Sequence, residues 1–326
     1  MMVERAQLIR RVATRLAIVL ALLAPTGYLG VSLLSAHLLT RPHNRPPGLD
    51  IQRYVPEAAA WSTRTADGLT LRGWYLPTRD HRRLIVLVHG LWAGWDKMAD
   101  IGIDLNQRGY DVLLFDLRGH GQSDPARLSM GKAERLDLRA ILAWADRHGF
   151  PSERVGWLGQ SMGASTILME GVDNPKIRAV VADSPYGDLP ELLETQLGQH
   201  SHLPHAFNPG ILFAAHRAFG LDAEKLVPIR LVNHHWGDRP ILLLHGEADT
   251  TVPIQQARLL AKALGPSCRM LTWPGVEHVE IYRDDPDRYI DLVDDFFRQN
   301  LTPSRPGSLR ERAHVAVDPR TPGRAL

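Results

Sequence analysis

The chain of 326 residues has a single cysteine, Cys268. One thiol excludes an intramolecular disulfide, and it excludes metal sites that are built from several cysteines. The residues after Cys268 read as a buried strand. This setting favours a structural role for the thiol over a nucleophilic one.

The sequence also lacks an excess of charge of one sign. Its 38 Lys and Arg residues face 36 Asp and Glu residues, which gives a formal net charge of +2. The arginines are scattered, and no basic stripe alternates with aromatic residues that could stack on bases. We therefore expect no nucleic acid partner. Hydrophobic residues make up 44% and charged residues 23%, the balance of a folded globular chain.

One long stretch, Leu16–Thr40, contains no Asp, Glu, Lys or Arg. As a helix it would extend for about 37 Å, enough to cross a hydrocarbon core of about 30 Å. Four arginines precede the stretch, whereas Arg41 and Arg45 follow it. This bias predicts that residues 1–40 are an uncleaved, single-pass membrane anchor, with the rest of the chain on the non-cytoplasmic side. A cleaved signal peptide and a helix lying on the membrane are the alternatives.

The anchor is followed by a linker over residues 41–60, whose first part, residues 41–50, is rich in proline and is expected to be extended. We expect this spacer to isolate the anchor mechanically, so that residues 1–40 contribute nothing to the active site. The folded domain is predicted over residues 61–300. Residues 301–326 have no apolar periodicity and are predicted to be a disordered tail.

From Leu84 onward, short apolar runs alternate with amphipathic helical stretches. Solidly apolar strands of this kind are typical of a parallel sheet that helices cover on both faces. Two earlier candidates, Trp61–Thr65 and Leu69–Leu76, flank an Asp-Gly turn and predict a hairpin, which makes the sheet mixed. The sequence thus predicts an α/β fold. The later strand candidates are Leu84–Val88, Val112–Phe115, Val155–Leu158, Ile177–Ala182, Ile241–Leu244 and Arg269–Trp273.

Residues 184–238 interrupt this alternation with a segment rich in His, Pro and Leu. Because the segment is inserted between two predicted strands, we interpret it as a cap over the strand ends, with helices near 189–197 and 211–219. Its histidines could suggest zinc, but no regular ligand helix such as H-E-x-x-H frames them. We therefore expect neither a metal nor another cofactor. These histidines are His200, His202, His205, His234 and His235.

The sharpest local signal is Gly159–Gly163, which reads Gly-Gln-Ser-Met-Gly and has Ser161 at its centre. This G-x-S-x-G motif follows a predicted strand and opens a predicted helix, the setting in which a sharp turn lifts a serine above a sheet. The two glycines allow the strand and the helix to approach each other closely. The N-terminus of the helix also favours developing negative charge. Ser161 is therefore the predicted nucleophile.

A serine nucleophile needs a base, and the base needs a carboxylate that orients it. The predicted strand Ile241–Leu244 runs into a turn that contains Asp249, and the last predicted strand ends shortly before His278. The serine, the aspartate and the histidine each lie just past the carboxyl end of a strand, where sites form in an open α/β sheet. We predict Asp249 as the acid and His278 as the base, with Glu247 as the alternative acid.

Four further motifs accompany the G-x-S-x-G motif at Gly159–Gly163: they are His89–Trp92, Asp116–Ser123, His245–Asp249 and Gly275–His278. Together and in this order they resemble the α/β-hydrolase superfamily, in particular its esterase, lipase and prolyl-oligopeptidase-like branches. The resemblance implies that the backbone N–H groups of Leu91 and Met162 form an oxyanion hole. We interpret His89 and the segment Asp116–Ser123 as structural turns.

The resemblance further implies a serine hydrolase that cleaves carboxylic esters through an acyl-enzyme and needs no cofactor. An anchor in residues 16–40 beside an apolar cap favours a lipid-like or hydrophobic ester. An aminopeptidase-like amidase or a thioesterase is the alternative reaction. The alternative from another class is a catalytically silent, membrane-tethered binding protein, and an intact triad argues against it.

Overall fold

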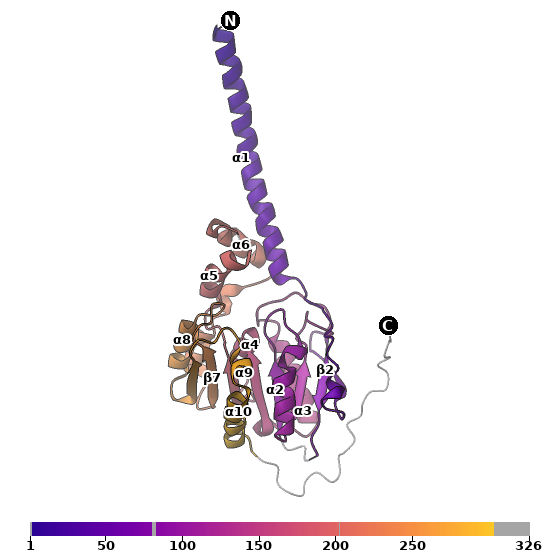
Figure 1. Ribbon diagram of the computed structural model, residues 1–326. Coiled ribbons are helices and arrows are strands. Elements are labelled where there is room, and N and C mark those ends of the chain that lie inside the picture. Colours follow the sequence, from indigo (N-terminus) through magenta and orange to yellow (C-terminus); the bar gives the residue numbers. More distant parts are fainter. Residues whose placement is uncertain (1, 80–82, 202, 303–326) are drawn as a thin grey trace.

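The computed structural model describes residues 2–79, 83–201 and 203–302, and Figure 1 gives its arrangement. One long helix projects from an α/β body, and a small helical cap lies at the base of that helix. Of the predicted tail, residues 303–326 lie outside the described residues, as does His202.

In the described part of the chain, eight strands form one sheet in the order β1-β2-β4-β3-β5-β6-β7-β8. The first two strands are antiparallel to their neighbours and the other six run parallel, so the predicted mixed sheet is confirmed. The strands are β1 (Ala59–Arg64), β2 (Thr70–Leu76), β3 (Leu84–Val88), β4 (Asp111–Phe115), β5 (Val155–Gln160), β6 (Ala179–Asp183), β7 (Ile241–Gly246) and β8 (Cys268–Trp273).

Two apolar cores lie on the two faces of this sheet, because most of its strands are buried on both sides. One core is covered by α2 (Ala99–Gln107) and α10 (Pro286–Asn300), with the short α9 (Ile281–Asp284) beside them. The other core is covered by α3 (Arg135–Arg147), α4 (Met162–Asp173) and α8 (Ile254–Leu264). The chain therefore has the α/β-hydrolase architecture that the motifs predict.

The segment between β6 and β7 contains three helices, α5 (Leu189–Ser201), α6 (Asn208–Phe219) and α7 (Pro228–His235). The first two form the cap beside the long helix (Figure 1). The third helix was not predicted, and it packs against α4 and α8 of the body. Its eight residues are too few to show a clear helical period in the sequence.

The long helix α1 (Met2–Thr40) is long and apolar enough to cross a membrane over Ile9–Thr40. The spacer that follows it is bound to the body. His43 N donates to Gly119 O at 2.6 Å, and Asn44 Nδ2 donates to Ser123 O at 2.7 Å. The expectation that the spacer isolates the anchor mechanically is therefore wrong. Prolines indicate an extended segment, but they do not show which loop that segment contacts.

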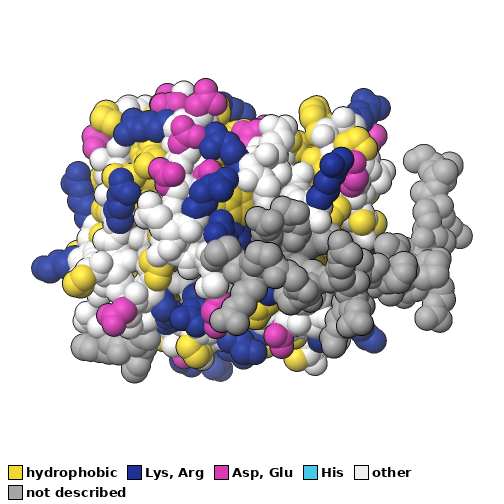
Figure 2. Space-filling view, turned by 90° about the horizontal axis from the view of Figure 1, so that it is seen from below, with side chains coloured by type: hydrophobic (Ala, Val, Ile, Leu, Met, Phe, Trp, Pro, Cys, Tyr) yellow, Lys and Arg dark blue, Asp and Glu magenta, His cyan; other side chains and the backbone are white. Residues whose placement is uncertain are grey.

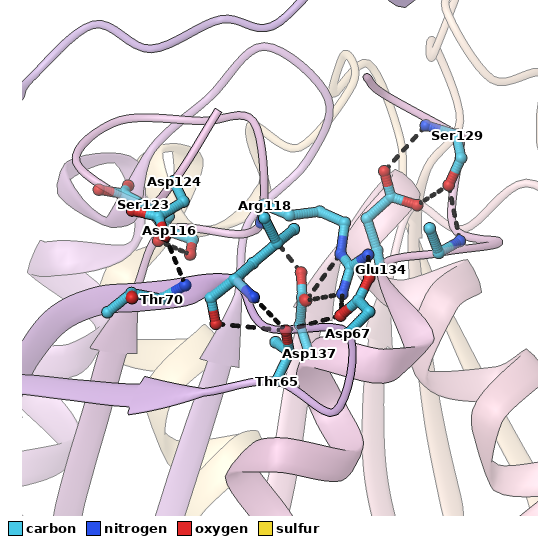
Figure 3. A network of polar contacts seen from close by, with 12 residues as sticks. Thr65, Asp67, Thr70, Asp116, Arg118, Ser123, Asp124, Ser129, Glu134 and Asp137 are labelled. Carbon is cyan, nitrogen blue, oxygen red and sulfur yellow. Dashed lines mark hydrogen bonds and ion pairs between the residues drawn. The ribbon is translucent and has the colours of Figure 1, made fainter. Parts of the chain in front are cut away.

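A buried cluster of charges joins the β1–β2 turn, the loop after β4 and helix α3 (Figure 3). Arg118 Nε donates to Asp137 Oδ1 at 2.8 Å, and its two terminal nitrogens donate to the Asp67 carboxylate at 2.7 and 3.0 Å. The Arg118 side chain is 4% exposed and the Asp137 side chain is fully buried. Asp137 therefore depends on Arg118 as its charged partner, whereas Arg118 has both Asp137 and Asp67.

Replacing Arg118 by methionine should destabilise the protein by about 3–5 kcal/mol, because Asp137 would then be buried without its partner. The measurement is denaturant-induced unfolding of the purified full-length protein. The matched control is Arg53→Met, since Arg53 pairs with Asp50 and both side chains are exposed. That control should cost less than about 1 kcal/mol. If both variants lost the same free energy of unfolding, Arg118 would not be needed to compensate the buried Asp137.

Candidate active site

Ser161 occupies the turn between β5 and α4, with φ of 51° and ψ of −120°. A non-glycine residue in this region of backbone space is strained, and only tight surroundings hold it there. A Cβ added to Gly163 would come within 2.2 Å of Val88 O, and one added to Gly159 within 2.6 Å of Ala164 N. Both glycines are therefore required by close approach, and the predicted strand–turn–helix setting of the serine is confirmed.

The structure brings Ser161, His278 and Asp249 together from three separate loops. His278 Nε2 lies 2.9 Å from Ser161 Oγ, and His278 Nδ1 lies 2.6 Å from Asp249 Oδ2. A carboxylate accepts hydrogen bonds, so Nδ1 carries the ring proton of neutral His278 and donates it to Asp249. Nε2 is then the acceptor for the serine hydroxyl.

Asp249 is held by four polar groups in a buried position. Its Oδ1 accepts hydrogen bonds from the backbone N–H groups of Thr251 and Val252 at 3.0 and 2.7 Å. Burial opposes ionisation, but hydrogen bonds from His245 and His278 outweigh it and lower the pKa of Asp249 to about 2. The carboxylate is therefore charged at neutral pH and able to stabilise a protonated His278.

His245 is a contributor that sequence reasoning did not assign to the site. Its Nε2 lies 2.8 Å from Val252 O and 3.3 Å from Asp249 Oδ2, and the side chain is fully buried. The carbonyl oxygen requires a proton on Nε2, so that proton also faces the carboxylate. The signal in the sequence was its position at the end of β7, four residues before Asp249. The alternative acid, Glu247, accepts a hydrogen bond from Thr272 Oγ1 at 2.7 Å instead.

The two residues expected in the oxyanion hole flank the same serine. A Cβ on Gly90 would lie 3.2 Å from Ser161 Cβ, so the loop that carries Leu91 runs directly past the nucleophile. Met162 is the first residue of α4, and its N–H therefore has no partner within the helix. Leu91 and Met162 both line a cavity that contains Ser161.

Two buried histidines hold this loop in place. His89 Nε2 accepts from Leu117 N at 3.0 Å, and His120 Nε2 accepts from Trp92 N at 3.2 Å. Burial lowers the pKa of His89 to about 4 and that of His120 to about 3. Both rings are therefore neutral acceptors that brace the backbone, in agreement with their interpretation as structural residues.

Two cavities meet at Ser161 and His278. One, the polar cavity, has a volume of about 510 Å³, and its partly apolar wall includes the charged side chains of Lys97, Asp100 and Arg283. The other has a volume of about 220 Å³ and is mainly apolar. Its lining residues include Leu39, Leu189, Leu193, Leu197 and Val252. Because Leu39 belongs to α1, the expectation that residues 1–40 contribute nothing to the active site is wrong.

Comparison with known proteins agrees with the fold. The model of the alpha/beta hydrolase fold family matches residues 83–224, and that of the TAP-like protein family matches residues 222–308. The uncharacterized protein Rv2307c of Mycobacterium tuberculosis is 30% identical over 217 residues, which cover 66% of this chain and 70% of that protein. The uncharacterized protein YqkD of Bacillus subtilis is 26% identical over 252 residues, covering 74% and 79%.

Among solved structures, the esterase Pf2001 of Pyrococcus furiosus superimposes with a TM-score of 0.69 at 22% identity. The match covers 81% of this chain and 99% of the esterase. The esterase RhEst1 of Rhodococcus has a TM-score of 0.56 at 18% identity, covering 74% and 99%. The chain belongs to the α/β-hydrolase superfamily.

The two bracing histidines make stability depend on pH in a defined direction. Below the unfolded-state pKa of about 6.5, the unfolded chain binds protons that native His120 and His89 do not, so stability falls with falling pH. Each of the two contributes up to about 1.4 kcal/mol per pH unit in this window. His120→Gln should therefore reduce the dependence of the unfolding free energy on pH between about 6.5 and 4. An unchanged slope in the variant would contradict a neutral, buried His120.

Proposed function

We propose that this protein is a serine hydrolase that cleaves carboxylic esters through a covalent acyl-enzyme. The observation that carries the proposal is the chain of hydrogen bonds from Ser161 through His278 to Asp249, with Ser161 at a strained turn. Serine is a weak nucleophile until a base accepts its proton, and the base works best when a carboxylate fixes its tautomer. These three residues supply all three functions.

In the first step, His278 Nε2 accepts the proton of the Ser161 hydroxyl while Oγ attacks the ester carbonyl carbon. The carbonyl oxygen becomes an oxyanion, which the N–H groups of Leu91 and Met162 would stabilise. A donor of this kind typically contributes about 2.7–4 kcal/mol. His278 then gives its proton to the leaving alkoxide, which departs as the alcohol and leaves the acyl group on Ser161.

In the second step, a water molecule takes the place of the alcohol. His278 accepts one proton from the water, the resulting hydroxide attacks the acyl carbon, and His278 returns the proton to Ser161 Oγ as the acid is released. Asp249 stays ionised throughout, because its four donors stabilise the charge. Its part is to hold the ring and to stabilise the imidazolium.

The same steps would cleave an amide or a thioester, so the choice of an ester rests on the lining of the site together with the similar folds of known esterases. An apolar cavity against Ser161 and His278 suits a hydrophobic acyl group. The similar folds of two esterases support this choice of reaction. The alternatives are an aminopeptidase-like amidase, which would have to bind a charged amino terminus, and a thioesterase, which fits the same apolar cavity.

We further propose that α1 is retained as a single-pass anchor, with the catalytic domain on the non-cytoplasmic side. Four arginines precede the apolar stretch, which favours a cytoplasmic N-terminus. Cleavage as a signal peptide would remove Leu39 from the wall of the apolar cavity. An alkaline carbonate wash tests the anchor, since the full-length protein should stay in the membrane pellet.

Ser161→Ala, His278→Ala and Asp249→Asn should each lower kcat for an ester by about 10⁴-fold or more, because the three act as one unit. The measurement is steady-state hydrolysis together with labelling by a fluorophosphonate probe, which should label the wild type and not Ser161→Ala. Ser152→Ala and His148→Ala are matched controls on the surface away from the site, and they should keep the wild-type rate. A folded wild-type protein that the probe does not label would favour the silent binding protein.

A further inference from the structure

Helix α1 packs against the cap, and this contact limits the length of α1 that could enter a bilayer without the cap. Tyr28 Oη donates to Ala206 O at 2.9 Å and accepts from Gly210 N at 3.1 Å, and the ring of Tyr28 stacks on Phe207. Further along, His37 packs edge-on against Phe219. Since Tyr28 meets the start of α6 and His37 meets its end, the two helices run in the same direction over the last third of α1. Figure 1 shows α6 beside this lower end of α1.

The free part of the apolar stretch is too short to cross a membrane alone. Between Arg15 and the first cap contact at Tyr28 lie twelve residues, Leu16–Gly27. At 1.5 Å per residue they extend for about 18 Å, whereas a hydrocarbon core is about 30 Å thick. A span that begins at Leu16 reaches the far interface only near Ser35. At Ser35, α1 already lies beside the C-terminal half of α6.

The exposed surface of the first half of α6 and of the adjacent part of α1 is apolar, as burial in a hydrocarbon layer would require. Phe213 of α6 is 64% exposed, and Leu29 and Leu34 of α1 are 52% and 59% exposed. The exposed basic residue Arg217 lies further along α6, and the exposed Arg41 follows directly after the end of α1. An apolar surface followed by cations matches a hydrocarbon layer followed by lipid headgroups. The opposite face of the body carries many Lys, Arg, Asp and Glu side chains (Figure 2).

The C-terminal end of α1 also lies against the candidate active site. Thr40 Oγ1 accepts from Arg127, whose guanidinium lies 4.2 Å from the centre of the Phe219 ring. One residue earlier, Leu39 lines the apolar cavity that reaches Ser161. The apolar cavity is thus bordered by α1 and by α5, whereas Lys97 and Arg283 line the polar cavity, which shares Ser161 and His278 with it.

We propose that α1 and the cap helix α6 enter one leaflet together, and that the apolar cavity takes the acyl chain of an ester drawn from that leaflet. The chain would lie against Leu39 and α5, and the polar part of the amphiphile would lie in the polar cavity. Leu39, a residue of the membrane helix, then helps to determine acyl-chain specificity. The substrate assignment rests on the proposed hydrolase function, whereas the depth of α6 does not.

Fluorescence quenching tests the depth without any turnover. In a Cys268→Ser background of the full-length protein, Phe213→Cys is labelled with a nitrobenzoxadiazole fluorophore and reconstituted into phosphatidylcholine vesicles. Dibromo-phosphatidylcholine should quench this label several-fold more than a label at Leu259→Cys, because Leu259 is also exposed and apolar but lies on α8 of the body. Equal quenching at the two positions would place α6 in water and overturn the proposal.

A substitution in the wall of the cavity tests the acyl assignment. Leu39→Trp should lower kcat/KM for a hexadecanoyl ester by at least about tenfold, since the larger side chain fills the cavity, and should change the rate on an acetyl ester less than about twofold. The matched control is Leu38→Trp, because Leu38 is 43% exposed and does not line the cavity. Equal losses on both esters would overturn the acyl assignment.

The two measurements separate this proposal from the proposed function. If the wild-type protein hydrolyses neither ester, the hydrolase function fails, and with it the substrate assignment, while the quenching still decides where α6 lies. If both esters are hydrolysed and Leu39→Trp behaves as Leu38→Trp does, the hydrolase function stands and the acyl cavity fails. Leu193→Trp, on α5, is the second variant that narrows the same cavity.

Discussion

The backbone of Ser161 is the constraint on which the rest of the site depends. The residue lies at φ of 51°, and its turn contacts the strands on either side of β5. Its own N–H donates to Asp183 O at 2.8 Å, and Gly163 lies against Val88 O with no room for a side chain. Because Asp183 ends β6 and Val88 ends β3, the two neighbouring strands hold the strained backbone in place.

Around this turn, the polar loops are tied to one another by buried contacts rather than by secondary structure. His89 and His120 connect the loop after β3 to the loop after β4. Arg118, in the same second loop, is fixed by Asp67 and Asp137. A network of this kind is costly to build, because every buried charge or polar atom needs a partner, but it leaves the backbone with one arrangement. The position of the Leu91 N–H is set in this way.

The relation between α1 and the α/β body differs from that of a flexible tether. Tyr28 of α1 bonds to the cap, and Phe219 of α6 packs against His37 of α1. Leu39, near the end of α1, lines the apolar cavity. A domain on a flexible linker would sample all orientations, whereas here the helix, the cap and the wall of the site form one packed unit. The proposed orientation of the site toward a bilayer would then be a property of the fold.

The strands, the order of the motifs and the choice of Ser161, Asp249 and His278 as site candidates could all be predicted from the amino-acid sequence. These depend on local patterns: solid apolar runs, glycines at a turn, and polar residues directly after strands. Three further contacts became visible only in the folded chain: His245 shares Asp249 with His278, the proline-rich spacer is bound to the loop at Gly119, and Leu39 reaches the site. Such contacts join residues that are far apart or of ordinary type, and no period or motif marks them. They are decided by which surfaces meet when the chain packs, a property that local patterns do not contain.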